Sequence, residues 1–127
     1  MPDTANADKL PRVLVVEDHP DTLAVMGKIL SRIPADGIPV ATCAAARDTA
    51  ARVPDLCVVI ADLHLPDGDG LELLAELKAK HGCATVVLSG TDAPTTGIPR
   101  WVDLWLTKPT TAQTLRRAVK SLCPDPA

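Results

Sequence analysis

An unbroken apolar run that ends in an aspartate most constrains what this chain can fold into. Six apolar residues occupy Leu56–Ala61, several of them β-branched, and Asp62 follows directly before a segment punctuated by proline and glycine. Such a run is typical of a strand covered on both faces, as in a parallel sheet flanked by helices. Because the strand ends at Asp62, we expect this carboxylate at the rim of the sheet, where open α/β sheets bind ligands.

The rest of the chain alternates short apolar strands with helical patterns. We expect strands at residues 12–16, 40–42, 85–88 and 104–107, and helices at residues 20–30, 44–52 and 70–80. A last amphipathic helix, capped by Thr110 or Thr111, would turn Leu115, Val119 and Leu122 inward. Between the last two strands, Pro94, Gly97 and Pro99 fall within residues 91–100, which predicts a loop or a short, frayed helix. This alternation predicts an α/β fold, a doubly wound five-stranded parallel sheet with helices on both faces.

Composition narrows the class of protein and its partners. The chain has 127 residues, enough for one domain, and a net charge of -3. That charge gives no broad electropositive field, so we expect no nucleic acid and no membrane as a partner. The first residues lack the layout of a signal peptide, and no apolar run approaches the ~20 residues of a spanning helix. We therefore expect a cytoplasmic protein.

The four cysteines are widely spaced and form no C-x-x-C pair. No histidine nearby completes the spacing of a zinc site. We expect Cys43, Cys57, Cys83 and Cys123 to be reduced, structural residues.

Polar side chains follow four of the five expected strands. They are Glu17 and Asp18, Asp62, Ser89 and Lys108. Because the carboxyl ends of parallel strands lie at one edge of a sheet, we expect these groups in a single cleft. Three carboxylates brought together repel one another, and hard oxygen ligands around an open position suit Mg²⁺.

The same cleft holds the groups that phosphoryl transfer requires. Lys108 supplies a positive charge for Asp62 or for a phosphoryl oxygen, and the hydroxyl of Ser89 can donate a hydrogen bond to that oxygen. A carboxylate nucleophile, a metal, a lysine and a hydroxyl donor are the parts needed to form an aspartyl phosphate.

Four motifs, in order, carry a family resemblance: Val-Leu-Val-Val-Glu-Asp, Ala-Asp-Leu-His-Leu-Pro-Asp-Gly-Asp-Gly, Val-Val-Leu-Ser-Gly and Leu-Thr-Lys-Pro. With them, residues 12–122 resemble a response-regulator receiver domain of bacterial two-component signalling. The resemblance implies a flavodoxin-like sheet with strand order 2-1-3-4-5. We expect residues 10–123 to form the receiver domain, between a disordered N-terminal tail (1–9) and a C-terminal tail (124–127).

The resemblance also implies a role for each residue of the cleft. Asp62 would be the phosphoacceptor, Lys108 the phosphate-pairing lysine and Ser89 the switch hydroxyl. Trp105 would occupy the position of the aromatic switch residue. Mg²⁺ would be bound by Asp18, Asp62 and the main-chain carbonyl of His64, with Glu17 acting through water.

A receiver domain of this kind implies a phosphorylation-controlled switch that is not an enzyme. Its phosphoryl donor would be a histidine kinase or a histidine phosphotransfer protein, and its output would go to an unknown downstream protein. The chain would be a single-domain receiver or the excised receiver of a larger regulator or hybrid kinase. Two departures from the family are the breakers in residues 91–100 and Thr110, where an aromatic usually follows Lys-Pro.

Two other functions fit part of the pattern. An aspartate-nucleophile phosphatase also uses a strand-end aspartate, but it needs a second acid two residues later, where this chain has His64. A pseudo-receiver would bind its partner without phosphorylation.

Several polar residues near these motifs have simpler interpretations. We interpret Asp67 and Asp69 as turn-shaping residues, and His19 and His81 as surface histidines. His64 either lies at the surface or overhangs Asp62 and affects the lifetime of the phosphoryl group.

Overall fold

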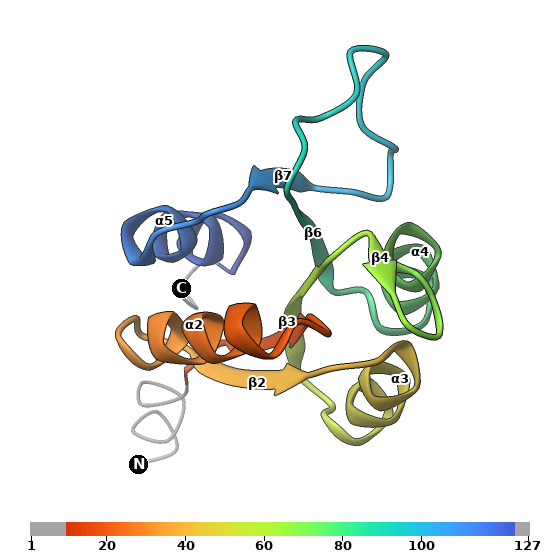
Figure 1. Ribbon diagram of the computed structural model, residues 1–127. Helices are drawn as coiled ribbons and strands as arrows, with labels where there is room; N and C mark the ends of the chain where they lie inside the picture. Colours follow the sequence, from red (N-terminus) through yellow and green to blue (C-terminus); the bar gives the residue numbers. More distant parts are fainter. Residues whose placement is uncertain (1–9, 124–127) are drawn as a thin grey trace.

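The computed structural model describes residues 10–123 as one five-stranded parallel sheet with two helices on each face (Figure 1). The sheet order is β2-β1-β3-β6-β7, the predicted 2-1-3-4-5 arrangement. Its strands are β1 (Arg12–Val16), β2 (Asp36–Val40), β3 (Leu56–Ala61), β6 (Ala84–Ser89) and β7 (Leu104–Thr107). The helices are α2 (Pro20–Ser31), α3 (Cys43–Arg52), α4 (Gly70–His81) and α5 (Ala112–Leu122). A separate two-residue ladder joins β4 (His64–Leu65) to β5 (Gly68–Asp69).

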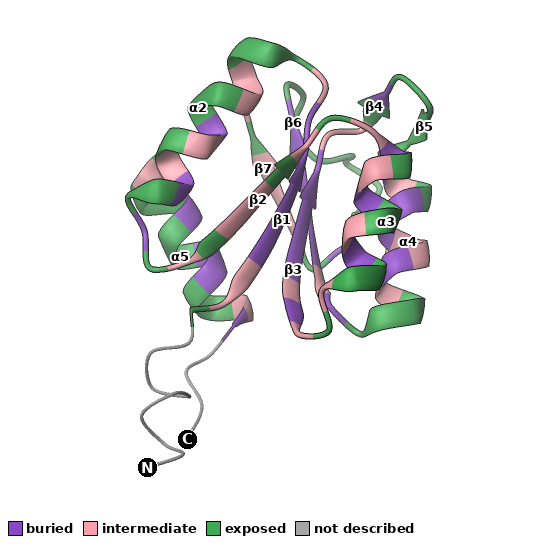
Figure 2. Ribbon diagram, turned by 90° about the horizontal axis from the view of Figure 1, so that it is seen from below, coloured by how far each residue is buried: buried purple, intermediate pink, exposed green. Residues whose placement is uncertain are grey.

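The sheet separates two hydrophobic cores. One lies under α3 and α4 and includes Leu14, Val59 and Leu74; the other lies under α2 and α5 and includes Val13, Ile60 and Leu115. Figure 2 shows the central strands buried between the two helical layers. Because β1 and β3 are covered on both faces, they read as continuous apolar runs rather than as alternating ones.

Local signals set the helix boundaries. Pro20 begins α2, where its missing N–H is not needed. The side chains of Thr42, Asp69 and Thr111 cap α3, α4 and α5 by accepting a backbone N–H bond each. Gly82 ends α4 with a φ of 68°, a left-handed conformation that favours glycine.

The second strand lies earlier than predicted. The sequence pattern favoured residues 40–42 because Gly37 and Pro39 interrupt the preceding run, yet β2 spans Asp36–Val40. This strand is at the edge of the sheet, where a proline loses no essential ladder bond. Gly37 is required there, since an added Cβ would lie 2.5 Å from Cδ1 of Leu30.

The segment between β6 and β7 contains turns and no helix, as the three breakers predicted. In Figure 1 it projects from the sheet edge beside β7. The predicted tails, 1–9 and 124–127, lie outside the described residues. Within residues 10–123, no helix has both the length and the apolar character needed to cross a membrane.

The expectation of four reduced cysteines is wrong. Cys43 and Cys83 are free and buried, but Cys57 and Cys123 form a disulfide between β3 and the end of α5, with their Cα atoms 6.0 Å apart. The two cysteines are 66 positions apart in the sequence, so their spacing does not indicate the pairing.

Candidate phosphoacceptor site

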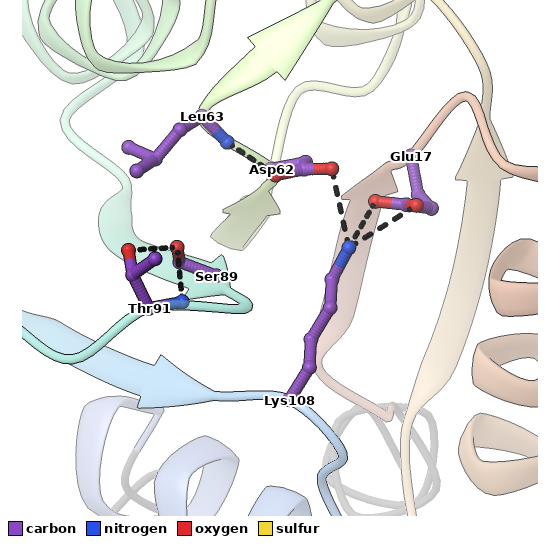
Figure 3. Close-up of polar contacts among 6 residues, drawn as sticks. All are labelled: Glu17, Asp62, Leu63, Ser89, Thr91 and Lys108. Atoms are coloured by element: carbon purple, nitrogen blue, oxygen red, sulfur yellow. Dashed lines mark hydrogen bonds and ion pairs between the residues drawn. The ribbon is translucent and has the colours of Figure 1, made fainter.

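The carboxyl ends of β1, β3, β6 and β7 lie together at one edge of the sheet. The ladders pair Val16 with Ala61 and Ser89 with Thr107, so Glu17, Asp62 and Lys108 emerge from neighbouring strands. Figure 3 shows the Lys108 side chain reaching across this edge toward both carboxylates. The parallel topology therefore brings together residues up to 91 positions apart in the sequence.

Lys108 is the positive centre of this cluster. Its Nζ lies 3.1 Å from Oδ2 of Asp62 and 3.3 and 3.2 Å from the two carboxylate oxygens of Glu17. The Glu17 side chain is 1% exposed and that of Asp62 is 17% exposed, so both ion pairs are shielded from water. One ammonium group thus faces two carboxylates, which leaves an excess of negative charge.

The crowding shifts the pKa values of Glu17 and Asp62 in opposite directions. Burial, followed by the neighbouring Asp62, raises the pKa of Glu17 above its ordinary value despite Lys108. Burial alone would raise the pKa of Asp62 as well, but its interactions with Glu17 and Lys108 and the N–H of Leu63 hold it below the ordinary value. A proton taken up by the pair therefore resides on Glu17, and Asp62 remains an ionised carboxylate.

Lys108 remains charged in this setting. Burial lowers the pKa of its amine, but the hydrogen bonds and charges of Asp62 and Glu17 outweigh that effect and raise it. The peptide bond from Lys108 to Pro109 is cis.

The backbone around Asp62 is tightly held. Its Oδ1 accepts a 2.7 Å bond from the N–H of Leu63, and its own N–H donates to the carbonyl of Val16 at 3.1 Å. The N–H of Gly70 donates to the carbonyl of Leu63 at 2.8 Å, and a Cβ at Gly70 would overlap the carbonyl oxygen of Asp62. Glycine is therefore required where α4 begins beneath the site.

Asp67 and Asp69 organise the loop that follows Asp62. The two carboxylate oxygens of Asp67 accept bonds of 2.8 and 2.9 Å from the N–H groups of Cys43 and Ala44 at the start of α3. Asp69 caps α4 by accepting the N–H of Leu71 at 2.8 Å. Both side chains accept hydrogen bonds from backbone N–H groups, which agrees with their interpretation as turn-shaping residues. Asp67 also connects the loop to α3.

Side chains that could hold a metal ion lie directly after β1. Oxygens of Glu17 and Asp18 and a ring nitrogen of His19 all lie within 4.8 Å of one another. Two carboxylates beside an excess of negative charge fit a hard divalent cation such as Mg²⁺. His19 is exposed, as expected of a surface histidine, but its ring belongs to this group. His64 lies in β4 with an exposed side chain.

Ser89 and Trp105 both contact Thr91, a residue that the sequence analysis did not identify. Ser89 is 4% exposed, and its Oγ lies 3.0 Å from Oγ1 of Thr91 and accepts the N–H of Thr91 at 3.1 Å. Nε1 of Trp105 donates to the carbonyl oxygen of Thr91 at 3.0 Å. Figure 3 shows Ser89 and Thr91 paired at the end of β6, apart from the cluster around Lys108.

The β6–β7 segment is also anchored at its far end, by Trp101 and Asp103. Asp103 accepts the N–H of Thr85 at 2.8 Å and pairs with the amine of Lys78 at 2.6 Å. Nε1 of Trp101 donates to the carbonyl oxygen of Leu71 at 3.0 Å. The loop is thus fixed to α4 and β6 although it has no helix of its own.

The sequence model of the family described as "Response regulator receiver domain" matches residues 13–120. The chain belongs to this family, which makes it a signalling domain rather than a phosphatase. The response regulator protein PilR of Pseudomonas aeruginosa is 35% identical over 71 residues, covering 55% of this chain and 16% of PilR. The chain thus spans about a sixth of the length of that curated relative.

Solved structures share the fold over nearly the whole chain. A sensor protein from Polaromonas sp. JS666 is 30% identical, with a TM-score of 0.77, over 88% of this chain and 94% of that one. The receiver domain of an HD domain-containing protein from Pseudomonas fluorescens Pf-5 is 24% identical, with a TM-score of 0.79, over 90% and 94%. TrrA from Thermotoga maritima, in complex with Mg²⁺ and BeF, is 22% identical, with a TM-score of 0.78, over 89% and 99%.

Proposed function

We propose that this chain is a phosphorylation-controlled switch in which Asp62 accepts a phosphoryl group. The observation that carries the proposal is the ionised Asp62 carboxylate, held by Lys108 at the sheet edge beside the buried Glu17. Family membership supports a phosphohistidine donor on a histidine kinase or a phosphotransfer protein.

In the proposed reaction, an oxygen of Asp62 attacks the phosphorus of the phosphohistidine. The new O–P bond forms as the N–P bond breaks, and the donor imidazole leaves with the bonding electron pair and takes up a proton. Lys108 then shifts from the carboxylate oxygen to a phosphoryl oxygen, which keeps the added charge paired. The protein contributes mainly by positioning the reacting groups and neutralising their charge.

We expect Mg²⁺ to be held by Asp18, Asp62 and the main-chain carbonyl of His64, with Glu17 acting through water. Its charge would neutralise the developing negative charge on the transferred group. The excess of carboxylates over ammonium groups supports this choice, and the complex of TrrA with Mg²⁺ and BeF is consistent with it.

The switch would begin at Ser89. When Asp62 carries a phosphoryl group, Ser89 would exchange its contact with Thr91 for a hydrogen bond to a phosphoryl oxygen. Thr91 would then move, and its carbonyl bond to Trp105 would transmit the change to the surface of β7. A downstream protein would read this surface together with α5.

Phosphorylation by acetyl phosphate and Mg²⁺ tests the assignment of Asp62. Intact-protein mass spectrometry should detect one phosphoryl group on the wild type and none on Asp62→Asn. Asp69→Asn is the matched control, since Asp69 lies in the same loop but caps α4. Label on Asp62→Asn would reject the proposal, and circular dichroism would verify that this variant is folded.

Beryllofluoride separates a switch from a pseudo-receiver. With Mg²⁺, it should change the fluorescence of Trp105, and Trp101→Phe should keep that change because Trp101 contacts α4 instead. A protein that takes up phosphoryl groups but gives no change from Trp105 would contradict the proposed route through Thr91.

A further inference from the structure

The four cysteines divide between the two faces of the sheet. Cys43 and Cys83 belong to the core under α3 and α4, where both are free. Cys57 and Cys123 belong to the core under α2 and α5, where they form a disulfide. The sheet therefore lies between the disulfide and both remaining thiols.

A β-bulge turns Cys57 toward α5. In the ladder of β1 and β3, Arg12 pairs with Leu56 but Val13 pairs with Val58, so Cys57 is an extra residue without a partner across the ladder. Strict alternation from Val58 would put Cys57 on the face of α3 and α4, together with Val59. Bulges commonly re-aim a side chain in this way. The backbone of β3 is thus shaped to present Cys57 to Cys123.

The second cysteine lies where α5 ends. Cys123 is 9% exposed and caps the helix by donating its N–H to the carbonyl of Val119 at 2.7 Å. The other end of α5 begins at Ala112, just after the cap Thr111 and close after Lys108 of the candidate site. The disulfide therefore fastens the end of α5 that is remote from Asp62.

Neither free thiol is suited to exchange with this disulfide. Burial raises the pKa of Cys43 and of Cys83, so both stay protonated near neutral pH, whereas thiolates are the attacking species. Cys57 itself is only half-buried, and Cys123 is at a helix terminus, where local opening is easiest. Such opening would give a small thiol access to the bond. The pair can open and close without scrambling the other two.

We propose that Cys57 and Cys123 are a reversible redox site that controls how firmly the last turn of α5 is attached to the sheet. Oxidation by a small disulfide such as oxidised glutathione forms the Cys57–Cys123 bond and breaks the S–S bond of the oxidant. The two protein thiols are oxidised, and their two protons and two electrons leave on two glutathione thiols. A dithiol reductant reverses the reaction and frees the end of α5.

The last turn of α5 would respond more than the phosphoacceptor site. Leu115 and Val119 are buried against the sheet, and this packing would retain the helix near Lys108 after reduction. Lys120 is an exposed residue of the turn that the bond anchors, so its position on the surface would change with redox state. A partner that reads α5 would therefore sense both phosphorylation and thiol oxidation.

Equilibration of the full chain in glutathione buffers of graded ratio, followed by alkylation and peptide mass spectrometry, tests the site. We expect one two-electron transition that involves only Cys57 and Cys123, in folded protein. Cys43→Ser and Cys83→Ser should keep it, whereas Cys57→Ser and Cys123→Ser should abolish it. A disulfide that includes Cys43 or Cys83, or one that is reduced only after unfolding, would overturn the proposal.

Amide hydrogen exchange measures the structural consequence. On reduction, the amides in the last turn of α5 should exchange about tenfold faster or more, while those of α3 should not change. Cys123→Ser should reproduce the reduced state in either buffer. Equal exchange of these amides in both redox states would refute the proposal that the disulfide controls the last turn of α5. Because neither measurement uses phosphorylation, each can fail or succeed independently of the function proposed for Asp62.

Discussion

Replacing glycine with alanine should have opposite effects at two helical positions of this protein, Gly70 and Gly27. Gly70 begins α4 directly beneath Asp62, and Gly27 lies within α2. Helix propensity favours alanine by about 1 kcal/mol in a helix interior. The difference between the two sites therefore measures how closely the backbone approaches Gly70.

The geometry at Gly70 reverses the sign of the effect. An added Cβ would overlap the carbonyl oxygen of Asp62 and lie 3.1 Å from Cα of Leu63, and both are backbone atoms that cannot rotate away. Relieving the overlap lengthens the 2.8 Å bond from the N–H of Gly70 to the carbonyl of Leu63, a loss of about 1 kcal/mol. Displacing packed backbone costs about 1–3 kcal/mol more. We expect a net loss of about 2 kcal/mol of unfolding free energy.

Urea unfolding followed by tryptophan fluorescence measures both variants. Gly27→Ala should be about 0.5–1 kcal/mol more stable than the wild type, because nothing lies within 4 Å of its added Cβ. Gly70→Ala should also slow phosphorylation by acetyl phosphate by about 10–100-fold, since the displaced backbone carries Asp62. Gly70→Ala with wild-type stability, or with normal phosphorylation despite lower stability, would refute the close approach or its link to the site.

Three further predictions follow from charges around the site. The raised pKa of Glu17 means that its carboxyl costs stability as the pH rises above 4.5, so Glu17→Gln should flatten the fall in melting temperature toward neutral pH. Backbone hydrogen bonds from Ala44 and Cys43 lower the pKa of Asp67, so the stability that its carboxylate contributes should be lost as the pH falls through that pKa. Asp67→Ala should therefore be less stable than the wild type only at a pH above this pKa. In the variant, amide hydrogen exchange should be faster at the start of α3. Millimolar Mg²⁺ should raise the melting temperature of wild type but not of Asp18→Ala; equal shifts would contradict the metal site.

Buried parallel strands were the part of the fold that the sequence predicted best. The bounds of β1 and β3 agree with their apolar runs, because strands covered on both faces leave few polar interruptions. The edge strand β7, which is only half-buried, also lies at its predicted residues. The edge strand β2 was misplaced because Pro39 is acceptable only where one side of the strand lacks a neighbour, which is a property of the sheet.

The cluster of Glu17, Asp62 and Lys108 follows from topology alone. Once the strands are parallel, residues that follow their carboxyl ends must share an edge, and no side-chain detail is needed to infer their contact. Thr91 illustrates the opposite case. It follows the Val-Val-Leu-Ser-Gly motif in the sequence, but its contacts with Ser89 and Trp105 depend on how a loop without regular structure folds back.

The periodicity of the sequence does not indicate the Cys57–Cys123 disulfide. The pattern of alternating faces assigns Cys57 to the side of α3 and α4, where it could never meet a cysteine at the end of α5. One unpaired residue in the β1–β3 ladder reverses that assignment for both Cys57 and Leu56 while leaving the rest of β3 in register. The apolar run reads the same with or without the bulge, because both faces of β3 are buried and either accepts a cysteine or a leucine. A strand with one solvated face would have exposed such a shift as a break in its polar alternation.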